Sequence, residues 1–337
     1  MRILVIGGSV FLGRAIVEDA LGRGHEVTTF NRGRSGPDLP GVEAVHGDRE
    51  VAADLERLVD GRRWDAVVDV CGFTPRVVLD SVRALSGHAA QYTFISSISA
   101  YADWPGKPGV TEESPLFDCP PDAEAGFGEY GVLKAGCERA VEQHFDGAAL
   151  IVQPGLILGP HENVGRLPWW LTRIAKGGRV LAPGDPGLPI QLIDARDIAA
   201  FTVTQAANGA AGRYMTGGVP GNATFGSWLG ACVEVTGSDA ELVWVDDRFL
   251  LDRDVQEWTE LPLWATSQSG AGVWSHSSAK ALAAGLTCRP VDETVRDTWE
   301  WLKDVPEERR SFGSQRLRHG IDPDKEARIL AEWDARS

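Results

Sequence analysis

The 337-residue chain is longer than a typical single small domain, and its 43% hydrophobic content is enough for a large core. Its net charge of −15 disfavours nucleic-acid binding, which would require a local basic patch. No stretch approaches the apolar length of a membrane span, and the N-terminus lacks the apolar run of a secretory signal, so we expect a cytoplasmic protein with no membrane partner.

The cysteines and the basic residues argue against a metal site, a disulfide framework and nucleic-acid binding. Five cysteines are spread along the chain without a CxxC pair: Cys71, Cys119, Cys137, Cys232 and Cys288. An odd number without metal-ligand spacing predicts reduced thiols. The basic residues Arg309-Arg310 and Arg316–His319 have acidic neighbours on both sides, so we expect a solvated helical surface there.

Short apolar runs alternate with helical patterns over the first two hundred residues. Residues 2–6 form a run stopped by glycines, as expected of a buried parallel strand, and residues 11–23 follow as an amphipathic helix. Further strands are expected at 26–30, 42–46, 66–70, 92–96 and 149–153. Helices are expected at 51–60, 75–86 and about 129–145. This alternation predicts an α/β fold, a doubly wound parallel Rossmann-type sheet with helices on both faces.

The composition changes after Pro154. Proline and glycine become frequent, and ten of the twelve tryptophans lie at Trp169 or later. One more strand and helix, at 191–206, are expected to belong to the first domain. We therefore predict two domains. The nucleotide-binding domain comprises residues 1–155 and 188–215, and a smaller C-terminal substrate-binding domain comprises residues 156–187 and 216–337.

A glycine-rich loop joins the first strand to the first helix: Gly7-Gly8-Ser9-Val10-Phe11-Leu12-Gly13. The helix N-terminus offers unpaired N–H groups and a positive dipole end to a pyrophosphate, so we expect the whole loop to contact a dinucleotide. Gly7 would make the tight turn, and Gly13 would let the helix pack on the strand. Val10 replaces the middle glycine of a GxxGxxG pattern, which shifts the expected contacts toward the Gly8 and Ser9 amides. A strand–turn–helix without a ligand is the alternative.

The second strand ends in Phe30-Asn31-Arg32-Gly33-Arg34. NAD-selective folds usually carry a carboxylate here that binds the ribose 2′-hydroxyl, and that carboxylate is absent. Arginine matches a 2′-phosphate in charge and bidentate geometry, so NADP(H) is the expected cofactor, with NAD(H) as the alternative. Asn31, Arg32 and Arg34 are the expected contacts. Asp48, after the third strand, is expected at the adenine, or as the N-cap of the next helix.

Tyr130 and Lys134 are four residues apart and share one face of a predicted helix. The ammonium favours the phenolate that proton transfer requires, and it can hold ribose hydroxyls. Ser96-Ser97-Ile98-Ser99 ends the fifth strand, at the edge where open α/β sheets bind ligands. A hydroxyl there can bind a substrate carbonyl. YxxxK alone is frequent by chance, and one serine can be a loop cap, but the set together predicts a catalytic centre.

These motifs resemble those of the extended short-chain dehydrogenases/reductases, of the NAD-dependent epimerase/dehydratase group. The segments that carry the resemblance are Gly7–Gly13, Ile95–Tyr101, Tyr130–Lys134 and Gln153–Pro160. A more specific similarity, to actinobacterial reductases, rests on Asn31–Arg34, Ala284–Pro290 and Glu293–Val295. The resemblance covers essentially the whole chain.

The resemblance implies Ser97, four residues before Tyr101, as the carbonyl-binding hydroxyl, and Pro154-Gly155 beside the nicotinamide. We also expect Cys71 and Gly72, after the fourth strand, at the cofactor. No substrate is implied, because members of the group reduce, epimerise or dehydrate very different molecules. No Asp-Glu pair follows Ser97 as in the sugar-nucleotide dehydratases, so dehydration is disfavoured.

A substrate pocket is suggested by aromatic and polar residues outside these motifs. The candidates are Phe73, Ser99, Trp104, Trp169, Trp170, Trp264 and His276. The alternative for each tryptophan is packing in the core or between domains. Arg196-Asp197 is expected to hold the domain junction by an ion pair and not to touch substrate.

The expected reaction is hydride transfer between the nicotinamide and a carbonyl or carbinol carbon of a small metabolite. Tyr130 gives or takes the proton, Lys134 tunes it, and Ser97 positions the oxygen. Nucleotide-sugar epimerisation is the enzymatic alternative, marked by a tightly held cofactor that is not consumed. A non-catalytic NADP-sensing or RNA-associated protein is the third, since the chain is also similar to chloroplast stem-loop-binding proteins. We expect a small-molecule partner, no nucleic acid, and a monomer or homodimer.

Overall fold

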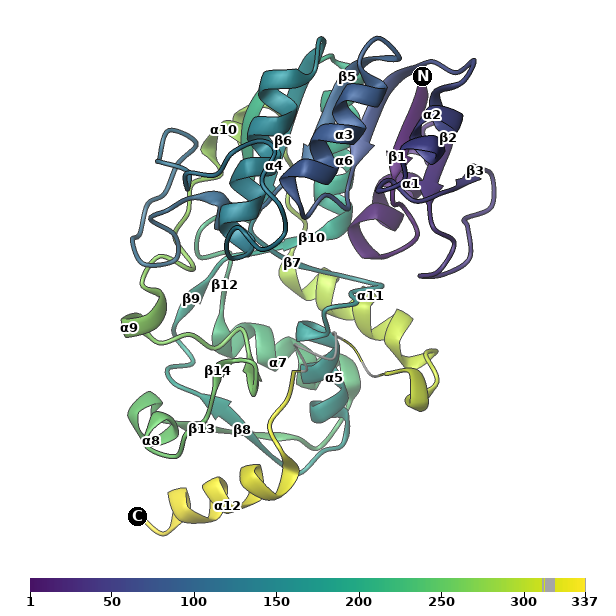
Figure 1. Cartoon of the computed structure of the whole chain (residues 1–337). Coiled ribbons are helices and arrows are strands. Elements are labelled where there is room, and N and C mark those ends of the chain that lie inside the picture. Colours follow the sequence, from purple (N-terminus) through teal and green to yellow (C-terminus); the bar gives the residue numbers. More distant parts are fainter. Residues whose placement is uncertain (311, 313–318, 337) are drawn as a thin grey trace.

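A seven-stranded parallel sheet forms the upper half of the molecule in Figure 1, in a computed structural model that describes residues 1–310, 312 and 319–336. The strand order is β11-β6-β5-β4-β1-β2-β3, and every neighbouring pair is parallel. The strands are β1 (Arg2–Ile6), β2 (Glu26–Asn31), β3 (Glu43–His46), β4 (Trp64–Asp69), β5 (Ala89–Ile95), β6 (Ala148–Pro154) and β11 (Gly212–Thr216). The predicted doubly wound Rossmann-type sheet is confirmed.

Helices cover both faces of this sheet (Figure 1). In β1, Ile3 and Val5 join one hydrophobic cluster, whereas Leu4 and Ile6 join another, because successive side chains of a strand point to opposite faces. The first cluster is closed by α1 (Phe11–Gly22) and α6 (Ala195–Ala207). The second is closed by α2 (Ala52–Val59), α3 (Pro75–Leu85) and α4 (Tyr130–His144). Burial on both faces explains why the strands read as nearly continuous apolar runs.

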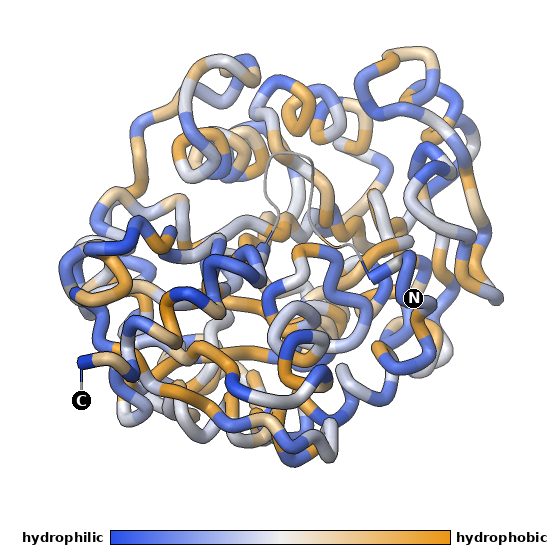
Figure 2. Tube along the Cα trace, turned by 90° about the horizontal axis from the view of Figure 1, so that it is seen from below, coloured by the Kyte–Doolittle hydropathy of each residue, from blue (hydrophilic) through white to orange (hydrophobic). Residues whose placement is uncertain are grey.

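The lower half of Figure 1 has its own core, rich in tryptophan. Its helices are α5 (Arg166–Ala175), α7 (Phe225–Thr236), α8 (Asp247–Leu251), α9 (Ser267–Gly270), α11 (Val291–Lys303) and α12 (Pro323–Asp334). Short strands pair as β7 (Leu156–Leu158) with β10 (Leu192–Asp194), β8 (Arg179–Pro183) with β13 (Glu241–Val245), β9 (Pro189–Ile190) with β12 (Ala223–Thr224), and β14 (Glu257–Trp258) with β15 (Leu261–Pro262). Figure 2 shows hydrophobic and hydrophilic residues alternating along the helices, as one buried face per helix requires.

One C-terminal segment packs on the sheet. Helix α10 (Ala279–Ala283) contacts β11, and Ala281 and Leu286 are buried in the cluster under α1 and α6. Lys280 donates to the Arg213 carbonyl oxygen at 2.7 Å. The two-domain division stays a prediction, and these contacts assign the segment around α10 to the sheet side.

Ion pairs hold the sheet to the C-terminal part, as expected. Arg196, at the start of α6, pairs with Asp194 at 2.7 Å and with Asp297 of α11 at 2.6 Å. Asp197 pairs with Arg289 at 2.9 Å. The ion pairing predicted for Arg196-Asp197 is confirmed, with Asp194, Asp297 and Arg289 as the partners, and the domain junction itself stays a prediction.

Three further expectations concern the chain as a whole. No helix among the described residues is long and apolar enough to cross a membrane. All five cysteines are free, as predicted. The basic segment lies partly outside the described residues, namely at 316–318; within the described part, Arg310 donates to the carbonyls of Lys303 and Val305 at the end of α11.

Candidate active site at the carboxyl edge of the sheet

The loop between β1 and α1 is built from closely packed glycines. Gly7 and Gly8 have φ angles of 106° and 94°, which favour glycine. A Cβ at Gly13 would lie 2.9 Å from Val70 Cγ2 and 3.0 Å from the Gly8 nitrogen. Gly13 therefore allows the close packing of helix on strand that the motif predicts.

The N-terminus of α1 is free of competing side chains. Val10 is its N-cap and makes no side-chain cap, and the first turn carries no acidic residue. The first N–H groups of the helix therefore remain available to an anion, with the positive dipole end behind them. Backbone conformation, helix end and charge all fit a pyrophosphate.

The end of β2 carries the exposed guanidiniums of Arg32 and Arg34. Arg32 lies 3.9 Å from Asp48, a long and partly exposed pair that holds the arginine weakly. Asp48 accepts from the Glu50 amide at 3.1 Å, and Val51 precedes the first residue of α2. Asp48 is therefore not the N-cap of that helix, because the helix begins further along the chain.

Asp38 places a carboxylate beside this strand end that was not expected from the sequence. Asp38 accepts a hydrogen bond from the Asn31 side-chain amide at 3.2 Å and lies 2.8 Å from His46 Nε2. The side-chain oxygen of Asn31 accepts in turn from the Gly33 amide at 2.7 Å. The sequence gives no indication of this contact, because Asp38 comes seven residues after Asn31, within a loop.

The end of β4 carries a buried ion pair, between Asp69 and Arg49, that was also not expected from the sequence. Arg49 donates to both carboxylate oxygens of Asp69, at 2.8 and 2.7 Å, and Tyr92 donates to Asp69 at 2.8 Å. Burial alone would raise the pKa of Asp69, but the Arg49 guanidinium and the Tyr92 hydroxyl hold that pKa below its usual value. Cys71, half-buried, donates to the Ile6 carbonyl at 3.4 Å, and burial raises the pKa of its thiol.

The side chain of Lys134 is buried where β4 and β5 end. Its Nζ donates to the Gly72 carbonyl at 2.9 Å and to the Ile95 carbonyl at 2.7 Å. It also lies 5.5 Å from the centre of the Phe73 ring, which is largely exposed. An ammonium has three hydrogens, so one remains for a ligand.

Tyr130 opens α4, and its side chain is 48% exposed and therefore accessible to a ligand. Its neighbour Gly131 lets the helix approach the fifth strand end, because a Cβ there would overlap the Ser99 carbonyl oxygen. Ser97 Oγ accepts from the Ser99 amide at 3.1 Å. The fold thus brings the serine segment against the first turn of α4, one turn from Lys134.

His276 lies against the end of β6, next to Pro154 and Gly155. A Cβ at Gly155 would be 2.6 Å from His276 Nε2, and one at Gly217 would overlap the same nitrogen. Burial lowers the pKa of His276 to about 4, against an interaction with the Val273 backbone that raises it. The imidazole is therefore a neutral group wedged between two glycines.

The tryptophans named as pocket candidates lie in different places. Trp170 and Trp264 are buried in the C-terminal core, where they donate to the Pro262 carbonyl and to Asp247, at 2.9 and 2.8 Å. Trp104 is half-buried in the loop between β5 and α4, and its Nε1 has no hydrogen-bond partner among the residues that the structure describes. Substrate roles for these residues stay predictions.

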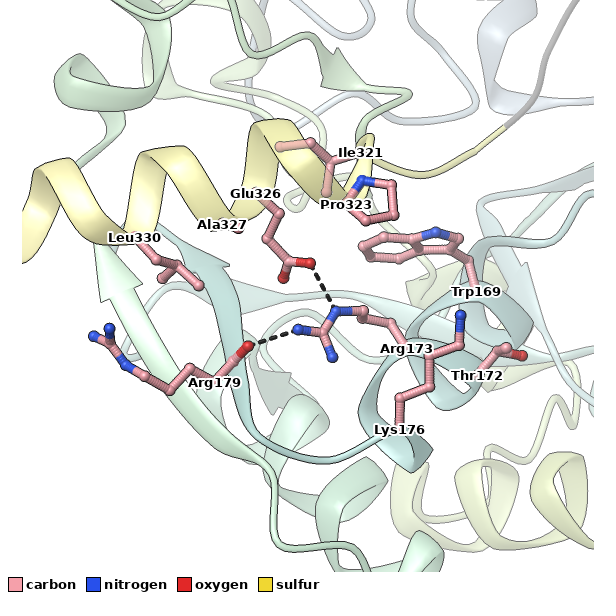
Figure 3. Close-up of a pocket in the computed structure, with 10 residues that line it drawn as sticks. All are labelled: Trp169, Thr172, Arg173, Lys176, Arg179, Ile321, Pro323, Glu326, Ala327 and Leu330. Carbon is pink, nitrogen blue, oxygen red and sulfur yellow. Dashed lines mark hydrogen bonds and ion pairs between the residues drawn. The ribbon is translucent and has the colours of Figure 1, made fainter.

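Trp169 lines a cavity of about 360 Å³ between α5 and α12 (Figure 3). Figure 3 shows Arg173 of α5 at its centre, bonded to Glu326 of α12 and to the Arg179 carbonyl. Of the predicted site residues, Trp169 alone lines this cavity among the described residues. The structure therefore does not bring it together with the serine segment and α4.

Metal ligands are a separate question. In the described part of the chain, no three His, Cys, Asp or Glu side chains gather as a metal site requires.

Comparison with known proteins supports the expected family. Residues 3–78 match the NAD dependent epimerase/dehydratase family. Over 217 residues the chain is 30% identical to a 2'-dehydrokanamycin reductase from Streptomyces kanamyceticus. That alignment covers 62% of this chain and 58% of the reductase, so the chain spans less than two thirds of this relative.

Solved structures share the fold at low identity. The UDP-glucose 4-epimerase of Thermus thermophilus, in complex with NAD, matches with a TM-score of 0.66 and 21% identity, covering 91% of this chain and 100% of that one. The UDP-N-acetylglucosamine 4-epimerase of Bacillus cereus matches with a TM-score of 0.67 and 17% identity, covering 91% and 98%. At these identities the likeness concerns the fold.

Proposed function

We propose that the chain, whose residues 3–78 match the NAD dependent epimerase/dehydratase family, is an NADP-dependent oxidoreductase of the extended short-chain dehydrogenase/reductase type. It transfers a hydride between the nicotinamide and a carbonyl or alcohol carbon of a small metabolite. The observation that carries the proposal is the buried Lys134 ammonium, which joins the ends of β4 and β5 one turn from the exposed Tyr130.

The cofactor site is proposed along the carboxyl edge. The Gly7–Gly13 loop and the uncapped start of α1 hold the pyrophosphate, and Lys134 holds ribose hydroxyls with its remaining hydrogen. Asp48 meets the adenine, and Cys71, Gly72, Pro154 and Gly155 border the rest. A bound nicotinamide supplies the hydride for reduction or accepts it for oxidation.

Three side chains act on the substrate oxygen. In reduction, Tyr130 donates its phenolic proton to the carbonyl oxygen while the carbon gains the hydride, so that an alcohol and a phenolate result. The nearby Lys134 charge stabilises the phenolate, and Ser97 donates a hydrogen bond to the oxygen as it gains negative charge. In oxidation the same groups act in reverse.

NADP is proposed over NAD because Arg32 and Arg34 are exposed at the end of β2. A guanidinium that is weakly held by Asp48 can turn to a 2′-phosphate and form charge-assisted hydrogen bonds. Asp38 is a competing carboxylate beside this strand end, but it is already engaged by Asn31 and His46.

The substrate is proposed to be a carbonyl compound, and the relative named as a 2'-dehydrokanamycin reductase supports a ketone on a sugar ring. Phe73 lies closest to Lys134 among the aromatic candidates, and its exposed ring is offered to such a ring. Ser99, Trp104 and His276 are proposed to line the rest of the pocket, whereas Trp169 lines the separate cavity between α5 and α12.

Nucleotide-sugar epimerisation is the second candidate, favoured by the sugar-nucleotide epimerases among the structures that share the fold. It uses the same Tyr130 and Lys134 and returns the hydride to the substrate. The two reactions differ in one measurable quantity. A reductase consumes NADPH in proportion to product, whereas an epimerase returns the cofactor to its starting oxidation state after each turnover.

The test is turnover of a carbonyl panel, followed as NADPH oxidation. Tyr130→Phe keeps the ring, so it should fold and bind NADPH like the parent while turnover falls roughly 10²–10⁴-fold. Lys134→Met should lower both the affinity for the cofactor and the rate, because the lost ammonium is the group proposed to hold the ribose hydroxyls and to stabilise the Tyr130 phenolate. Ser97→Ala should lower the rate alone. Thermal melts confirm folding first, and a folded Tyr130→Phe with the parent rate would refute this active site.

A further inference from the structure

Helix α4 carries a third polar side chain in line with the proposed catalytic pair. Glu138 follows Tyr130 and Lys134 at the same four-residue spacing, and its side chain is fully buried. A buried carboxylate is costly unless it is hydrogen-bonded on all sides, so its contacts should reveal what holds it there.

Glu138 joins three neighbouring strands of the sheet. It accepts from the Ser96 hydroxyl at 2.5 Å, from Gln153 Nε2 at 2.9 and 3.1 Å, and from Arg213 Nε at 3.2 Å. These three partners come from the end of β5, from β6 and from β11. Gln153 is held in turn by the buried Tyr101, whose hydroxyl donates to its Oε1 at 2.7 Å.

Lys134 complements this arrangement on the other side. Its ammonium bonds the Gly72 and Ile95 carbonyls, whereas Glu138 bonds the hydroxyl of the very next residue, Ser96. Two buried side chains of opposite charge, one helical turn apart, thus grip consecutive residues at the end of β5. The residue that follows is Ser97.

Two of the partners of Glu138, the Gln153 NH₂ and the Arg213 guanidinium, can only donate, whereas the Ser96 hydroxyl can donate or accept. The ionised carboxylate, which only accepts, matches all three partners at once, with both of its oxygens engaged. The site therefore fits a carboxylate in chemistry as well as in shape.

We propose that Glu138 is a positioning residue, which as a carboxylate fixes the end of β5 and thereby the orientation of Ser97 toward the substrate oxygen. This inference rests on the proposed function for the role of Ser97. A purely structural buried ion pair is the competing explanation, and it predicts a loss of stability without a change in catalysis.

The charge state of Glu138 gives the proposal a signature. Burial raises the pKa of Glu138 to about 7, against the hydrogen bonds from Ser96 and Gln153 and the charge of Arg213. The other ionisable groups facing it are Glu142 on the same helix and Tyr101. We expect turnover to rise as pH passes through neutrality, because the carboxylate that grips Ser96 then forms.

The experiment compares Glu138→Gln with Glu142→Gln in the full chain. Glu142 is a matched control, because it lies one turn further along α4 and pairs with the same Arg213, at 2.6 Å. Glu138→Gln should lower kcat roughly tenfold, equivalent to about 1.4 kcal/mol, with the NADPH Kd unchanged. The turnover of Glu138→Gln should also no longer rise near pH 7. Glu142→Gln should keep the parent's kcat and the parent's rise in turnover near pH 7.

Ser96→Ala is the second variant, since it removes the hydroxyl that donates to Glu138 and so breaks the same hydrogen bond from the β5 side. If one contact is responsible, the double variant Ser96→Ala/Glu138→Gln should be no slower than the slower single variant. Hydrogen exchange supplies a readout that needs no turnover: amides of residues 95–99 should exchange faster in Glu138→Gln and not in Glu142→Gln.

The outcomes separate this inference from the proposed function. If Tyr130→Phe is inactive but Glu138→Gln matches Glu142→Gln in kcat, pH profile and exchange, the positioning role is wrong and the proposed reaction stands. If Tyr130→Phe keeps the parent rate, the proposed reaction fails, and the exchange comparison alone still decides whether Glu138 holds the end of β5. Equal exchange would then overturn the inference.

Discussion

At the carboxyl ends of β1–β3 the chain offers a ligand mostly backbone and exposed side chains. Gly7, Gly8 and Gly13 pack closely against their neighbours, and Arg32 and Arg34 reach into solvent. At the ends of β4–β6 the chain offers buried charged side chains instead. Lys134 and Glu138 each bond to groups from more than one strand or strand end.

The difference indicates how each side responds to substitution. Where backbone does the binding, an added Cβ has nowhere to go, but an exposed arginine can be replaced with little effect on folding. Where buried charges do the work, removing one partner leaves others without a hydrogen bond inside a low-dielectric site. The proposed cofactor side should therefore be sensitive to shape, and the proposed reaction side to charge.

The largest effect is expected from Gly13→Val, which attacks the shape of the cofactor side. Its added Cβ would lie 2.9 Å from Val70 and 3.0 Å from the backbone of Gly8. We expect a loss of at least roughly 2 kcal/mol in unfolding free energy, or a folded protein that does not bind NADPH. Urea melts and calorimetric titration measure the two outcomes.

Gly22→Val is the matched control, since it makes the same substitution in α1. An added Cβ at Gly22 would meet no described atom within 4 Å outside its chain neighbours and the backbone of its own helix. It should bind NADPH like the parent. Val10→Gly, in the same loop, should also be tolerated. A folded Gly13→Val protein with the parent affinity would place the cofactor elsewhere.

The next effect is confined to a pH window and tests charge on the reaction side. The folded-state pKa of Glu138, about 7, lies above the ordinary value of 4.5, so this group favours folding below pH 4.5 and that contribution is lost as pH rises to 7. Relative to Glu138→Gln, the parent should lose roughly 2–3 kcal/mol of unfolding free energy between about pH 5 and pH 8. Urea melts at both pH values measure this difference.

The partly exposed Glu142 again gives the control, and Glu142→Gln should follow the parent's dependence on pH. Parallel curves for the parent and Glu138→Gln would mean that Glu138 does not change its charge in this window. The pH dependence proposed for turnover would then lose its cause.

The smallest effect is expected from Arg32→Ala on the cofactor side. The parent should bind NADPH at least roughly tenfold more tightly than NADH, about 1.4 kcal/mol, and the variant should narrow that gap, because the 2′-phosphate loses a charge-assisted hydrogen bond. Arg248→Ala removes the same charge from the C-terminal part and should leave the gap unchanged. Equal affinities of the parent for the two cofactors would refute the preference for NADP.

Local pattern alone was enough for the sheet, the glycine loop and the helix face shared by Tyr130 and Lys134. These features repeat over two to four residues, and the two-faced burial of β1 or the rise of α4 follows directly from such spacing. The open ends of the strands, where Ser97 lies, follow from the rule that parallel strands finish at one edge.

Contacts between distant segments were decided only by the tertiary structure. Asp38 reaches Asn31 through a loop, His276 fills the space between Gly155 and Gly217, and the segment around α10 returns to the sheet. None of these pairings has a sequence period, because each depends on where the chain comes back. Glu138 lies between the two cases: its spacing from Lys134 was visible in the sequence, but only the packing of α4 against three strands brings it to Ser96.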